Sequence, residues 1–173
     1  EVAEKAGAYD TLVVWTDTLK KDVWAARSAF LTVIEAQSKL LDEMDVVVPV
    51  DKIAPFLVYV HEEAEKQGVY IKSFGHAGDG NLHIYCCSND LEEEEFKRRV
   101  KKLMDASYTK CTEFEGQVSG EHAIGHAKKQ YLRESVGETT YALMGQIKKV
   151  FDPNEILNPG KVCHDLKGGA EEC

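Results

Sequence analysis

The sequence has no run of about 18 apolar residues, so no segment of it is expected to cross a bilayer as a helix. Its first five residues are polar or charged apart from Val2 and Ala3, which argues against a signal-peptide core at this end. The chain also lacks an initiating Met, and we expect it to begin inside a longer polypeptide. The expected location is the cytoplasm. The alternatives are membrane association through partners and, if a targeting segment precedes Glu1, an organelle.

Positive charge is outnumbered, because 21 Lys and Arg residues stand against 30 Asp and Glu residues and the net charge is −9 at pH 7. A nucleic-acid surface needs clustered Lys and Arg to release counterions. The one dense basic run, 97–102, lies beside the acidic run 92–95, as is typical of a solvated helix face. We therefore expect no nucleic-acid partner.

Several common motifs are missing as well. Neither a G-x-G-x-x-G turn nor a P-loop occurs, so no nucleotide-binding unit is visible. The five cysteines form no C-x-x-C pattern, and the adjacent Cys86 and Cys87 are poorly placed for a bridge with each other. This cysteine usage favours reduced thiols in an intracellular compartment.

The residues that are present predict one α+β domain over residues 1–173. β-branched and apolar runs predict strands at 11–15, 45–49, 69–74, 82–87 and 117–119. Apolar periodicity predicts helices at about 17–41, 51–68, 90–115, 127–134 and 138–151, with Asp51 as an N-cap and Gly68 as a C-terminal stop. Because strands and helices do not alternate regularly, we expect a largely antiparallel sheet with helices packed on it. The tail at 167–173 is expected to be mobile.

The segment Gly75-His76-Ala77-Gly78-Asp79-Gly80-Asn81-Leu82-His83 carries the strongest chemical signal. Glycine, Asp and Asn at this density allow a tight hairpin tip, which would bring His76 and His83 to one place. Neutral imidazole is a good ligand for Zn²⁺, and a carboxylate would complete a His₂Glu site with open positions. Glu121, in Ser119-Gly120-Glu121-His122, is the natural third ligand. The alternative is a hydrogen-bonded turn without metal.

His122 is adjacent to this ligand, and a tight loop could turn both side chains into one cavity. An imidazole there could act as a general base, or it could be a structural histidine that caps the next helix. His126 is read as a supporting or surface residue. The run from 150 to 161, with two prolines and a glycine, predicts a rigid turn that exposes Asn158 and Lys161.

Three motifs in order, GHAGDGNLH, SGEHAIG and KKVFDPNEILNPGK, resemble the C-terminal domain of the FAD-linked 2-hydroxyacid oxidase and dehydrogenase family. Its members include the flavin-bearing component of glycolate oxidase, D-lactate dehydrogenases and D-2-hydroxyglutarate dehydrogenase. The resemblance implies a ferredoxin-like cap domain whose first strand lies before Glu1. It also implies a separate FAD-binding domain in the same polypeptide, and hence that this part alone is inactive.

The resemblance further implies roles for individual residues. His76, His83 and Glu121 would hold a divalent metal, with zinc the first choice and manganese or iron the alternatives. His122 would be the general base, and Arg27 would pair with the substrate carboxylate. Asn158 and Lys161 would approach the FAD. The implied partners are a 2-hydroxy acid and an electron acceptor, either a protein or a quinone.

Two residues depart from the D-2-hydroxyglutarate enzymes, which have a lysine at the position of Glu43 and an asparagine at that of Tyr85. Both changes disfavour a second-carboxylate pocket and favour oxidation of a D-2-hydroxy acid of the lactate or glycolate type. Two other classes stay open: a metal-dependent hydrolase using the same ligands, and a non-catalytic ligand-binding or oligomerisation module. A hydrolase would act without flavin, and a module would bind neither metal nor hydroxy acid.

Overall fold

The structure is a computed structural model that describes residues 1–163. These residues fall into two compact units, Glu1–Lys39 and the part that begins at Leu40. Within residues 1–163, no helix has both the length and the apolar character that crossing a membrane requires. The mobile tail expected at 167–173 lies outside the described residues.

The first unit is helical and consists of α1 (Val2–Lys5), α2 (Asp17–Ser28) and α3 (Phe30–Gln37). The Thr16 hydroxyl caps α2 by accepting a hydrogen bond from the Leu19 amide. The single helix expected over 17–41 is in fact two helices that meet at Ala29. The strand expected at 11–15 is wrong. These residues are irregular, because residues 1–39 contain no strand that could pair with them.

The second unit is built on a three-stranded sheet of β1 (Leu40–Val47), β2 (Tyr70–His76) and β3 (Asn81–Ser88). The strand order is β1-β3-β2, and both pairings are antiparallel. β2 and β3 form the expected hairpin around the glycine-rich segment. The strand predicted at 45–49 begins earlier, at Leu40, and ends at Val47.

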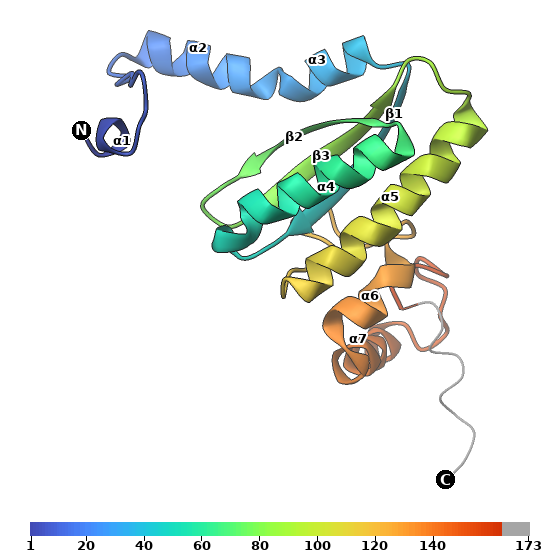
Figure 1. Cartoon of the computed structure of the whole chain (residues 1–173). Coiled ribbons are helices and arrows are strands. Elements are labelled where there is room, and N and C mark those ends of the chain that lie inside the picture. Colours follow the sequence, from blue (N-terminus) through green and yellow to red (C-terminus); the bar gives the residue numbers. More distant parts are fainter. Residues whose placement is uncertain (164–173) are drawn as a thin grey trace. The chain divides into compact units, whose positions relative to one another are not determined.

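Two helices, α4 (Ile53–Gln67) and α5 (Glu93–Glu113), cover one face of this sheet (Figure 1). Side chains of alternate strand residues enter the core between sheet and helices, among them Met44, Val46 and Ile84, which are fully buried. Asp51 does not cap α4, since a 3-10 turn, η1 (Val50–Lys52), precedes it. Gly68 ends the helix in a left-handed conformation, as predicted.

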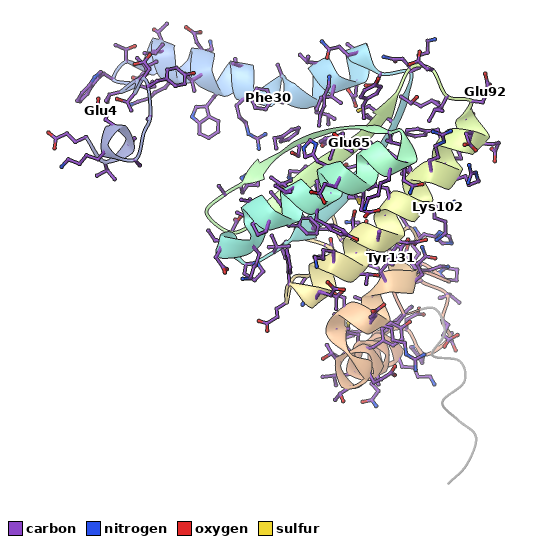
Figure 2. All side chains as sticks on the ribbon, in the orientation of Figure 1. Glu4, Phe30, Glu65, Glu92, Lys102 and Tyr131 are labelled. Carbon is purple, nitrogen blue, oxygen red and sulfur yellow. The ribbon has the colours of Figure 1, made fainter. Side chains whose placement is uncertain are left out.

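The remaining strand residues point to the opposite face, which therefore carries polar groups from all three strands. The segment that follows α5 crosses to β1, where Gln117 forms an antiparallel bridge with Val47. After this bridge, the chain continues into α6 (Lys129–Val136) and α7 (Glu138–Phe151). Tyr131 of α6 lies against α5 (Figure 2), where its ring is 4.3 Å from that of Tyr108 and its hydroxyl donates to Asp105. The loop between Gln117 and α6 is thus anchored at both ends.

The expected α+β class, with helices packed on an antiparallel sheet, is confirmed. This fold determines where the predicted site residues lie. The SGEHAIG loop and the tip of the β2–β3 hairpin both lie at the same end of β1.

Candidate metal and acid–base site

The hairpin tip places His76 at the end of β2 and His83 on β3, with their ring centroids 6.0 Å apart. The amides of Asp79 and Gly80 both donate to the carbonyl of His76 and so close the turn. Gly80 has a φ of +77°, and a Cβ there would lie 1.9 Å from the carbonyl oxygen of Val48. Only glycine fits at position 80.

Asp45 of β1 organises the loop that carries Glu121 and His122. Its carboxylate is 1% exposed and faces the backbone of the loop. Oδ2 accepts hydrogen bonds from the Ser119 hydroxyl at 2.9 Å and from the amides of Gly120 and His122 at 3.1 and 2.9 Å. The Glu121 amide also donates to it, at 3.2 Å. One buried carboxylate therefore fixes four successive residues.

Further contacts keep this carboxylate ionised. Burial alone would raise the pKa of Asp45, but the His122 amide, the Asn81 amide group, the Lys128 ammonium and the Ser119 hydroxyl together hold it well below its usual range. Lys128 lies 3.2 Å from Oδ2 and also donates to the Asp45 carbonyl. The packing is tight, since a Cβ on Gly120 would lie 1.7 Å from Asn81 Nδ2.

The structure brings the three predicted metal ligands together. Glu121 Oε1 lies 2.9 Å from His83 Nε2 and 3.6 Å from His76 Nε2, and the three donor atoms lie within 4.8 Å of one another. Two donors on one tetrahedral zinc ion lie about 3.3 Å apart, so these residues fit such an ion with small side-chain movements. His83 is buried, whereas His76 and Glu121 are about half exposed, which leaves an approach for a substrate.

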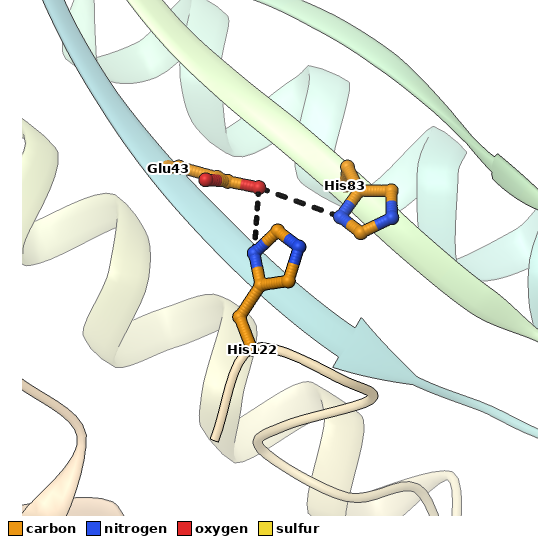
Figure 3. Close-up of side chains that lie close together, drawn as sticks. All are labelled: Glu43, His83 and His122. Carbon is orange, nitrogen blue, oxygen red and sulfur yellow. Dashed lines mark ion pairs between the residues drawn. The ribbon is translucent and has the colours of Figure 1, made fainter. Parts of the chain in front are cut away.

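Glu43 joins the same cluster, which we did not predict (Figure 3). Its Oε1 lies 3.4 Å from His83 Nδ1 and 3.2 Å from His122 Nδ1. The rings of His83 and His122 stack with centroids 4.7 Å apart. A signal was available in the sequence: Glu43 and Asp45 alternate with the apolar Met44 and Val46, which puts both carboxylates on the face opposite the core.

The other predicted residues belong to other segments of the chain. Arg27 is part of α2, in the first unit. Asn158 and Lys161 hydrogen-bond to each other in the turn after α7, at 3.3 Å. This turn is attached to the SGEHAIG loop, because the Val162 amide donates to the carbonyl of Gly125. His126 lies near the surface, 3.1 Å from Lys129 Nζ.

Four cysteines lie within residues 1–163, and three of them, Cys86, Cys87 and Cys111, are buried free thiols, while the fourth is Cys163. Burial raises the pKa of the Cys111 thiol to about 12 and that of Cys86 further, so both stay protonated at neutral pH. None of the four belongs to the groups of side chains that could hold a metal among the described residues.

Comparison with known proteins gives a match over residues 1–162 to the family described as FAD linked oxidases, C-terminal domain. A D-lactate dehydrogenase of Anaerostipes hadrus is 58% identical over 96% of this chain and 35% of its own length. The glycolate oxidase component GlcD of Bacillus subtilis is 32% identical over 88% of this chain and 33% of its own length. A D-lactate dehydrogenase of Archaeoglobus fulgidus is 35% identical over 96% of this chain and 36% of its own length. The chain therefore spans about a third of the length of these curated relatives.

Proposed function

Because the chain belongs to the family of C-terminal domains of FAD-linked oxidases, we propose that it forms the metal- and substrate-binding part of an FAD-dependent oxidoreductase. The proposed reaction converts a D-2-hydroxy acid of the lactate or glycolate type into the 2-oxo acid, as the names of its relatives suggest. The observation that carries this proposal is the convergence of His76, His83 and Glu121 on one side of the sheet, with His122 beside them.

His76, His83 and Glu121 would hold the metal, with zinc the first choice and manganese or iron the alternatives. A bound divalent ion would supply Lewis acidity, lowering the pKa of a substrate hydroxyl that it contacts. On zinc, two nitrogens and one carboxylate oxygen would leave a fourth position open, and a fifth where the coordination expands, for a hydroxyl and a carboxylate oxygen of the substrate. A 2-hydroxy acid carries these two groups on adjacent carbons.

The chain's own residues would orient the substrate and move one proton. Arg27 would meet the substrate carboxylate, since a guanidinium can bind both of its oxygens. His122 would take the hydroxyl proton at a ring nitrogen. A flavin, when bound, supplies the acceptor for the Cα hydrogen and its two electrons. The loss of this hydrogen and of the hydroxyl proton converts the hydroxy acid into the oxo acid and balances the reaction.

The side chains near the histidines support a small monocarboxylate as the substrate. Glu43 and Tyr85 are direct partners across β1 and β3, so both departures from the D-2-hydroxyglutarate enzymes lie on one patch of the site face. The Tyr85 ring stacks on Phe74 at 5.3 Å, which fills this patch with aromatic surface. A second substrate carboxylate placed there would be repelled by the negative charge of Glu43.

The turn that carries Asn158 and Lys161 is our candidate for contact with the flavin. Its attachment to Gly125, three residues after His122, supports this role, because it ties the turn to the loop that carries the proposed base. Electrons would then leave to an acceptor protein or a quinone.

The experiment uses the complete polypeptide with its FAD-binding domain and an artificial electron acceptor. We expect turnover of D-lactate or glycolate and little of D-2-hydroxyglutarate. His122→Ala should lower the rate by about 10²–10⁴, while His61→Ala, at an exposed position on α4, should not. Equal turnover in both variants would contradict the role of His122 as the general base. Hydrolysis of an ester or amide without flavin would support a hydrolase instead.

A further inference from the structure

Glu43 is the unexplained group in this site. Its Oε1 and the Nδ1 of His83 are both shielded from water, and neither forms a hydrogen bond of good geometry with another described residue. Buried polar atoms nearly always have such a partner. Here the carboxylate oxygen faces Nδ1 of two different imidazoles, at 3.2 Å for His122, the long end of the usual N–H···O range, and at 3.4 Å for His83, slightly beyond it.

An ionised carboxylate can only accept hydrogen bonds, so a hydrogen bond between this oxygen and either imidazole requires the proton on Nδ1. A neutral imidazole has one N–H, and its other nitrogen then carries a lone pair. The proton on Nδ1 therefore leaves a lone pair on Nε2 of both histidines. In each ring Nε2 is also the nitrogen nearer Glu121, at 2.9 Å for His83 and 4.0 Å for His122.

We propose that Glu43 is a positioning residue that sets the tautomer of His83 and His122 together, aiming one Nε2 lone pair at the metal and the other at the substrate hydroxyl. Carboxylates behind metal-bound histidines fix ring orientation and strengthen the ligand. Here a single oxygen serves both a metal ligand and the base, whose rings are stacked 4.7 Å apart. The proposal rests on the proposed function for the roles of the two histidines, and on the contacts above for the role of Glu43.

The test measures the tautomer of His122 directly. The chain, with ¹⁵N-labelled histidine and saturated with zinc, is studied by NMR at a pH where its uncoordinated imidazoles are neutral. We expect the proton of His122 on Nδ1 in the wild type. In Glu43→Leu, which has similar bulk and no acceptor, the proton should move to Nε2. Glu43→Gln keeps a carbonyl oxygen and should retain the Nδ1 proton.

Zinc affinity provides the second measurement, by competition with a chelator. Glu43→Leu should weaken zinc binding by about 10–100-fold. Asp42→Asn is the matched control, because Asp42 is the adjacent carboxylate on β1, points to the opposite face of the sheet from Glu43, and belongs to neither of the two groups that could hold a metal among the described residues, His76–His83–Glu121 and Glu43–His83–His122. Its zinc affinity should match that of the wild type.

Three results would overturn the proposal. The first is a His122 tautomer that is the same in wild type and Glu43→Leu. The second is unchanged zinc affinity in Glu43→Leu. The third is two zinc ions in the wild type and one in Glu43→Leu, which would make Glu43 a ligand. If the wild type binds no zinc, the proposed function fails by itself, and the His122 tautomer in the metal-free chain still decides the role of Glu43.

Discussion

Replacing Asp45 by Asn should destabilise the fold strongly while preserving the shape of the side chain. The carboxylate accepts hydrogen bonds from one hydroxyl and three loop amides and pairs with the buried Lys128. Removing one partner of a buried ion pair costs about 3–5 kcal/mol, because the other charge is left uncompensated. Asn keeps one carbonyl acceptor, so we expect the lower end of that range, about 3 kcal/mol.

Urea unfolding of the chelator-treated protein, followed by circular dichroism at pH 7, measures this loss. The control is the double variant Asp45→Asn/Lys128→Met, in which both members of the buried ion pair are neutral. It should be more stable than Asp45→Asn alone by about 1–2 kcal/mol, since coupled residues are not additive. An Asp45→Asn variant within about 0.5 kcal/mol of the wild type would refute the role of Asp45 as an anchor.

The same carboxylate gives the stability a defined dependence on pH. Folding lowers the pKa of Asp45 below its unfolded value, so below about pH 4 the unfolded chain binds more protons. The stabilisation that the ionised Asp45 carboxylate contributes is therefore complete above its unfolded-state pKa. It is lost as the pH falls through the folded-state pKa. The stability gap between wild type and Asp45→Asn should narrow progressively below about pH 4. A constant gap down to about pH 2 would contradict this reasoning.

Three further substitutions test the turns that support the site. Gly120→Ala puts a Cβ 1.7 Å from Asn81 Nδ2, so zinc affinity should fall about 10–100-fold; Gly78→Ala, where a Cβ meets nothing within 4 Å, is its control. Gly80→Ala, at a φ of +77°, should lower the free energy of unfolding, measured in urea, by at least about 1–3 kcal/mol. Asp152→Asn should speed hydrogen exchange at the amides of Ile156 and Leu157, which Asp152 caps with its pKa held low by Lys148. Unchanged exchange there would contradict the cap.

The parts of the site that were predictable from sequence are those encoded locally. Glycines around His76 and His83 predicted the hairpin tip, because a sharp turn between two strand-like runs has few other solutions. The irregular order of strand-like and helical runs also predicted an antiparallel sheet with helices packed on it. The residue types also suggested Glu121 as a ligand and His122 as a base, but they left a metal-free turn and a helix-capping histidine open, and the family resemblance then favoured the two functional roles.

The parts that were missed depend on distant contacts. Asp45 binds amides 75–77 residues further along the chain, so no local pattern reveals its role. Glu43 was missed because the predicted strand began only at residue 45, whereas β1 begins at Leu40, where the sequence pattern had predicted the end of a helix. The failed strand at 11–15 shows the converse, since β-branched residues form strands only where a partner strand is available.

The central claim is that His76, His83 and Glu121 bind a divalent metal, and elemental analysis of the purified chain tests it most directly. The wild type should contain about one zinc, manganese or iron per chain, and the double variant His76→Ala/His83→Ala should contain none. His61→Ala/His126→Ala, which removes two histidines outside the ligand cluster, should keep the metal. Equal metal content in all three proteins, or none in the wild type after dialysis against Zn²⁺ and Mn²⁺, would contradict the claim.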